Sequence, residues 1–218
     1  MGLPPATAPL GRPAGTEHVA VEPLRGRTGA YLTVRDAASR VRVTFAVLPG
    51  LLYRISTPAD SGLAPLGCGT GGQPQVCFRR TSGDGPDDVS IVLNRDVRWD
   101  IRLPAGAGEQ QLDLTGGRVT RVDLGPSGLA ELRLPAPAGT VPVTFTQSVG
   151  RVVMTVPGAP VRLRLDLGAG PVVTPWAVRA AAGAGEVLEE PGWPVARDRY
   201  AVAARSTVGS LLLDRLGR

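Results

Sequence analysis

Three stretches of the chain, IRLPAGAG (101–108), LRLPAPAG (132–139) and LRLDLGAG (163–170), are nearly the same and begin 31 residues apart. Each opens with aliphatic residues two positions apart, such as Ile101 and Leu103. This spacing points both side chains to one face of a β-strand. The glycines that follow favour a turn. The repetition therefore predicts an array of strands and glycine turns with a 31-residue period.

Apolar pairs with the same spacing recur about every ten residues through this region. The pairs are Ile101 with Leu103, Leu112 with Leu114, Val122 with Leu124, Leu132 with Leu134, Val143 with Phe145, Met154 with Val156, and Leu163 with Leu165. About three short strands per copy indicate a β-solenoid or a stacked meander, in which each copy buries its apolar face against its neighbours. We expect Leu103, Leu134 and Leu165 to lie inward, stacked on one another.

The sequence pattern divides the chain into three regions. Residues 1–16 are rich in Pro, Ala and Gly without apolar periodicity, which predicts a disordered arm. Residues 17–95 contain alternating segments such as RVRVTF (40–45) and predict an N-terminal β segment with a cysteine-bearing loop. Residues 96–218 hold about three copies of the repeat and a C-terminal cap near 199–213. The expected fold is all-β, a repetitive array of short strands with almost no helix.

Arg102, Arg133 and Arg164 occupy the same position in the three copies. If the copies stack in register, these side chains form a ladder on one outer face. One interpretation is that the arginines pair with nearby acids and discourage edge-to-edge aggregation. The other is that they bind an anionic polymer or an acidic partner.

Cys68 and Cys77 enclose GTGGQPQV, a segment rich in turn-forming residues whose ends can easily meet. A disulfide that closes this short loop would stabilise the fold by about 2–3 kcal/mol and would imply an oxidising compartment. Two reduced, unrelated cysteines are the alternative. A metal site is disfavoured because the CxxC spacing is absent and no histidine lies nearby.

The charge balance argues against nucleic acid as a partner. Every basic residue is arginine; there are 24 of them against 19 acids, which gives a net charge of +5. The arginines are scattered, whereas a nucleic-acid footprint requires clustering. A genome rich in G and C, as in actinobacteria, gives the same excess of Arg, Ala, Gly and Pro. The longest apolar run, FAVLPGLLY (45–53), is too short for a membrane span, so we expect membrane contact only through an anchor not present in this sequence.

Sequence motifs for catalysis are largely missing. The single histidine, His18, has no G-x-S-x-G partner motif, and the glycines of 67–72 lack the Lys-Ser/Thr of a phosphate loop. Asp84, Asp87 and Asp88 lack the spacing of a calcium loop. We therefore expect no catalytic residue, no resident metal and no cofactor.

The motifs WDIRLPAGAG (99–108), LDL (112–114), VTRVDLG (119–125) and LRLP (132–135) resemble those of bacterial proteins of the putative-adhesin or toast-rack class. The resemblance covers roughly residues 95–215. It implies a single-layered or solenoid-like β array and a place at the cell envelope, often behind a membrane anchor. It implies no firmly established catalytic activity.

These observations favour a non-enzymatic, envelope-associated scaffold or adhesin-like binding protein that acts through a repetitive β surface. Its expected partner is an anionic polymer or another envelope protein. One alternative is a polysaccharide-active enzyme on a β-solenoid, using carboxylates such as Asp113, Asp123, Glu131 and Asp166. Another is a cytosolic, self-assembling structural protein. The resemblance places the chain at the envelope, whereas a chain complete as written would be cytoplasmic, since it shows no signal peptide.

Overall fold

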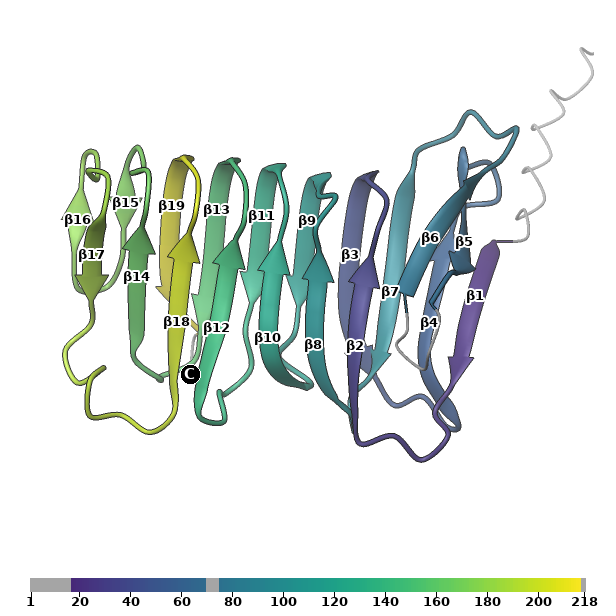
Figure 1. The fold of residues 1–218 in the computed structure, drawn as a ribbon, viewed down its shortest axis with the longest axis horizontal. Coiled ribbons are helices and arrows are strands. Elements are labelled where there is room, and N and C mark those ends of the chain that lie inside the picture. Colours follow the sequence, from purple (N-terminus) through teal and green to yellow (C-terminus); the bar gives the residue numbers. More distant parts are fainter. Residues whose placement is uncertain (1–16, 70–74, 217–218) are drawn as a thin grey trace, which may run out of the picture.

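The chain forms two long β-sheets that face each other, as the computed structural model in Figure 1 shows. The structure describes residues 17–69 and 75–216. The predicted arm, residues 1–16, lies outside the described residues. Within the described part every regular element is a β-strand, so the predicted all-β, repetitive fold is confirmed.

The larger sheet, sheet A, has ten strands. In spatial order they are β1 (His18–Pro23), β4 (Leu51–Thr57), β7 (Asp88–Asn94), β3 (Ala38–Ala46), β9 (Ala107–Asp113), β11 (Ser127–Arg133), β13 (Val149–Val156), β19 (Val208–Arg215), β15 (Val172–Val173) and β16 (Val178–Arg179). Sheet B has nine strands. They are β17 (Glu186–Glu189), β14 (Val161–Leu165), β18 (Arg199–Ala204), β12 (Thr140–Phe145), β10 (Arg118–Leu124), β8 (Arg98–Leu103), β2 (Gly29–Val34), β6 (Gln75–Arg80) and β5 (Leu63–Gly67).

The repeating unit is a coil, defined here as one strand of sheet B followed by one strand of sheet A. The coils β2–β3, β8–β9, β10–β11, β12–β13, β18–β19 and β14–β15 stack through parallel pairing in both sheets. All seven predicted apolar pairs point between the sheets, and each of these side chains is 2% exposed or less. Their burial builds one continuous apolar core along the stack.

The structural period is shorter than the 31 residues that the sequence predicts. Ile101 pairs with Val122, and Val122 with Val143, so that equivalent positions in sheet B are 21 residues apart. A step of 31 residues spans three strands and therefore moves a residue from one sheet to the other. Leu103 lies in β8 of sheet B, whereas Leu134 directly follows β11 of sheet A. The expected stacking of Leu103, Leu134 and Leu165 on one another is therefore wrong.

The coils do not stack in sequence order. The C-terminal coil, β18–β19, lies between β12–β13 and β14–β15, where Figure 1 shows it in yellow between green neighbours. Residues 199–213 were expected to cap the array, and this expectation is wrong because strands on both sides pair with them. The coil β2–β3 is likewise inserted between β6–β7 and β8–β9. The predicted boundary near residue 95 thus falls inside the two continuous sheets.

Antiparallel hairpins close both ends of the stack. At one end, β1 pairs with β4, β4 with β7, and β5 with β6, all antiparallel. At the other end, β15 pairs with β16 and β14 with β17. The strands at this second end are short, two residues in β16 and four in β17, which leaves few backbone groups for another chain to pair with.

A column of glycines runs along one corner of the stack. In stacking order it consists of Gly108, Gly128, Gly150, Gly209 and Gly170. Each lies at, or just before, the start of a sheet A strand. The pairing of β11 with β13 skips Gly128 and Gly150, and that of β13 with β19 skips Gly150 and Gly209. The same irregularity is thus repeated from coil to coil.

Close approach of the coils excludes side chains from the glycine column. A Cβ atom on Gly150 would lie 2.6 Å from the carbonyl oxygen of Gly128, and one on Gly128 would lie 3.2 Å from that of Gly108. A Cβ on Gly209 or Gly170 would also overlap the carbonyl of the neighbouring column glycine. Glycine is therefore needed here because the backbones come close, a use that requires no unusual φ angle.

We predict that Gly150→Ala lowers the free energy of unfolding by about 1–3 kcal/mol, because its methyl group would press against the backbone of the next coil. The matched control is Gly158→Ala, where an added Cβ meets nothing within 4 Å. It should change stability by less than about 1 kcal/mol. Urea denaturation of both variants measures the difference. Equal effects of the two substitutions would contradict the role of the column.

Candidate functional site

The structure does not bring the three predicted ladder arginines together. Arg102 lies in β8 and Arg164 in β14, both in sheet B, but β10, β12 and β18 separate these strands. Arg133 lies in β11 of sheet A. The expected ladder is wrong for the same reason as the 31-residue period: three strands per step carry Arg133 to the opposite sheet.

Arg102 and Arg164 have acidic partners on the outer face of sheet B. Arg102 donates two hydrogen bonds of 2.8 Å to the carboxylate of Asp100, and these bonds raise the pKa of Arg102. Arg164 lies 2.8 Å from Asp166, which also accepts a hydrogen bond of 3.0 Å from Arg205. The bonds from Arg205 and Arg164 lower the pKa of the Asp166 carboxyl. At these two positions the arginines pair with nearby acids.

The largest hollow on the described surface lies on the outer face of sheet A. We call it the β7 groove; its volume is about 750 Å³, and its lining includes Arg40, Arg42, Ser56, Asp60, Asp88 and Ser90. Its floor is β7, and β4 and β3 flank it. Ser90 pairs with Ser56 on one side and with Arg42 on the other. The serines are small, so the floor stays low beneath the larger neighbours.

Local sequence positions these groups. In RVRVTF (40–45) the valines Val41 and Val43 are buried, so Arg40 and Arg42 point outward. The far wall is the segment 58–60, which turns away from the end of β4 through a hydrogen bond from the amide of Ser61 to the carbonyl of Pro58. The Ser61 hydroxyl then donates to Asp87 at 3.1 Å, which ties this wall to the segment before β7.

Most charges around the β7 groove are already paired. Arg40 donates to Glu109 at 2.7 Å and to Asp88 at 3.2 Å, and the bond from Arg40 lowers the pKa of Glu109. Glu17 accepts a hydrogen bond of 2.7 Å from Arg54. These exposed pairs contribute little to stability, but they hold the rim side chains in place.

Arg42 differs from Arg40 in its partners. Its guanidinium donates two hydrogen bonds, of 3.3 and 3.2 Å, to the neutral side-chain oxygen of Gln111. Among the described residues, no carboxylate forms an ion pair with it. Arg42 also borders a second hollow of about 300 Å³, lined by Thr44, Gln111, Asp113, Glu131 and Arg133, which we call the β9 hollow. Arg42 is therefore a ridge between two depressions and carries a charge that no acid neutralises.

The groove is a poor match to a glycoside-hydrolase site. Such enzymes use a pair of carboxylates, one of which donates a proton to the substrate. Asp88 and Glu17 already accept hydrogen bonds from Arg40 and Arg54, which leaves Asp60 alone. The other carboxylates proposed from the sequence are dispersed: Asp113 and Glu131 border the β9 hollow, whereas Asp123 and Asp166 lie on or beside sheet B.

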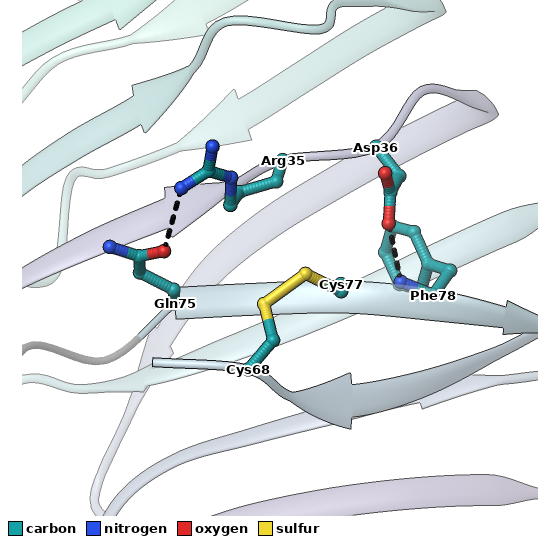
Figure 2. The surroundings of a disulfide bond; sticks show 6 residues. All are labelled: Arg35, Asp36, Cys68, Gln75, Cys77 and Phe78. Atoms are coloured by element: carbon teal, nitrogen blue, oxygen red, sulfur yellow. Dashed lines mark hydrogen bonds between the residues drawn. A yellow bond between two sulfur atoms is a disulfide. The ribbon is translucent and has the colours of Figure 1, made fainter. Parts of the chain in front are cut away.

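Cys68 and Cys77 are joined by a disulfide at the edge of sheet B (Figure 2). The sulfur atoms are 2.05 Å apart and the Cα atoms 5.8 Å apart. The bond links the end of β5 to β6, an antiparallel hairpin. Beside it, Arg35 donates to Gln75 at 3.0 Å, and Asp36 accepts from the amide of Phe78 at 2.8 Å. These contacts fasten β6 to the end of β2, where the backbone pairing covers only two residue pairs.

Two searches of the described residues gave no further site. Residues 17–69 and 75–216 hold no group of three or more His, Cys, Asp or Glu side chains arranged to bind a metal ion. The same residues include no helix with the length and apolar character needed to cross a membrane. The Asp84, Asp87 and Asp88 segment connects β6 to β7.

Comparison with known proteins identifies the fold class. A solved structure from Clostridium sporogenes, described as a "putative cell adhesion protein", is similar to this chain with a TM-score of 0.69. The two sequences are 13% identical, and the match covers 92% of this chain and 99% of that one. No protein-family model matches the sequence. No curated protein matches it either. At this identity the likeness shows the shared two-sheet fold and nothing about the ligand.

The sequence contained half of the signal for the β7 groove. Alternation in 40–45 places Arg40 and Arg42 on an outer face, and this is confirmed. The groove itself arises because β4 and β3 flank β7 in the order β4–β7–β3. That order joins segments up to about 50 residues apart in the sequence and leaves no local pattern.

We predict that replacing Cys68 and Cys77 together by serine lowers the free energy of unfolding by about 2–3 kcal/mol, because the unfolded chain regains the entropy of a ten-residue loop. Urea denaturation measures the change. Dithiothreitol should produce the same loss in the wild-type protein and no further loss in the double variant. A wild-type protein indifferent to the reductant would argue against a stabilising bond.

Proposed function

We propose that the protein is a non-enzymatic, adhesin-like binding protein of the bacterial envelope, which acts through the outer faces of its stacked coils. The observation that carries the proposal is the β7 groove together with the β9 hollow. They form a continuous polar surface on sheet A, with the unneutralised Arg42 between them. The fold shared with a putative cell adhesion protein supports the same reading.

The Cys68–Cys77 bond supports an extracytoplasmic location. Disulfides persist in oxidising compartments and are rare in the reducing cytosol. A protein on the outside of the cell also meets extended polymers, for which a long, regular and rigid sheet face is a suitable binding surface. The resemblance of the sequence to envelope proteins points the same way.

The closed ends of the stack favour binding over self-assembly. Short antiparallel strands at one end, and β1 with Glu17 and Glu22 beside it at the other, leave little edge for strand addition. A filament-forming protein would instead expose long, flat edges at both ends. We therefore propose that the molecule works as a single binding unit.

Beads coated with the purified protein should retain cell-wall fragments of the bacterium that encodes it, and the retained fragments should release no soluble sugar. Beads coated with the urea-unfolded protein are the control, because unfolding removes the sheet faces and keeps the composition. Sedimentation of the free protein should show no filaments at increasing concentration. Failure to retain the fragments, release of soluble sugar, or concentration-dependent filaments would each contradict the proposal.

A further inference from the structure

The two depressions of sheet A combine features that together select a class of ligand. The β7 groove, of about 750 Å³, is open and has a polar floor. Arg42 separates it from the β9 hollow, of about 300 Å³. Because Arg42 borders both, a ligand that fills both must pass over its guanidinium. This arrangement suits an extended chain of units better than one small molecule.

The walls of the β7 groove offer opposite chemistry on opposite sides. The segment 58–60 on the β4 side carries Asp60, for which no side-chain hydrogen bond is found among the described residues. The β3 side carries Arg42, which has only the neutral Gln111 as a partner. Strands β4 and β3 lie two strand spacings apart, about 10 Å. A sugar unit fits within that width.

The groups that remain free define what such a unit must carry. A guanidinium held by a neutral amide can still pair with a carboxylate of the ligand, and charge-assisted bonds of this kind are the stronger ones. The carboxylate of Asp60 accepts hydrogen bonds from hydroxyl groups, and Ser56 and Ser90 both donate and accept them. The ligand therefore needs one negative charge and several hydroxyl groups per unit.

A phosphate polymer fits this surface less well. Its higher density of negative charge would lie close to Asp60, Asp88 and Glu17, all of which line the groove. A neutral sugar would leave Arg42 without the partner that desolvation requires. Resting on the proposed binding function, we infer that the β7 groove binds an acidic polysaccharide, with a uronate carboxylate on Arg42 and sugar hydroxyls on Asp60, Ser56 and Ser90.

The test is isothermal titration calorimetry with trigalacturonic acid as the probe. The wild-type protein should bind it, and Arg42→Gln should weaken binding about tenfold or more, as expected for a lost charge-assisted hydrogen bond. The matched control is Arg151→Gln. Arg151 is an exposed arginine on the outer face of β13 that lines neither depression, so its loss should change the affinity by less than about twofold.

Two further arms separate the ligand classes. The methyl ester of the same trisaccharide lacks the charge and should bind about tenfold more weakly. An oligomer of glycerol phosphate should also bind more weakly than trigalacturonic acid. Ser90→Leu, which fills the floor without touching Arg42, should abolish binding, and circular dichroism with thermal unfolding checks that each variant is folded.

The inference is overturned if trigalacturonic acid does not bind, if its ester binds equally well, or if Arg42→Gln binds as the wild type does. Equal or tighter binding of the glycerol phosphate oligomer would assign the groove to phosphate polymers instead. Coated beads that still retain cell-wall fragments in any of these cases would leave the proposed binding function standing. The ligand class and the binding function therefore fail separately.

Discussion

The close backbone contact of neighbouring coils at the glycine column is the constraint on which the rest of the structure depends. There a Cβ atom would overlap the carbonyl of the next coil, so that only glycine lets the coils approach. The column lies at the starts of the sheet A strands and sets the register from which they continue. A shift of one residue would turn every outward side chain inward. Burial of the apolar pairs, two to a coil, then supplies the main driving force.

Register in turn determines the outer face that we propose as a binding surface. Ser56, Ser90 and Arg42 form one row only because β4, β7 and β3 pair at those positions. Arg40 in the neighbouring row is held by Glu109 and Asp88, whereas Arg42 faces the neutral Gln111. Two arginines of one strand, two positions apart, thus acquire different roles from their neighbours on β9 and β7. The fold creates this difference, since the two residue types are the same.

Patterns within single strands predicted structure well, and patterns between strands did not. The spacing of two residues correctly predicted seven buried pairs, such as Ile101 with Leu103, because pleating alternates side chains within one strand. The 31-residue echo misled because three strands make one and a half coils. Gly108 and Gly170 belong to the repeated motif and to the column, but Gly128 and Gly150 have no such motif around them. Insertion of β18–β19 has no local signal, because it is settled by long-range pairing.

Paired cysteine substitutions test the out-of-sequence stacking most directly. Leu212 on β19 pairs with Val153 on β13 and with Val173 on β15, and the side chains of all three lie on the outer face. We predict that mild oxidation cross-links Val153→Cys with Leu212→Cys, and Val173→Cys with Leu212→Cys. Val153→Cys with Val173→Cys should stay reduced, since about 10 Å separates strands two apart. Cross-linking of the last pair, with none to position 212, would contradict the insertion of the C-terminal coil.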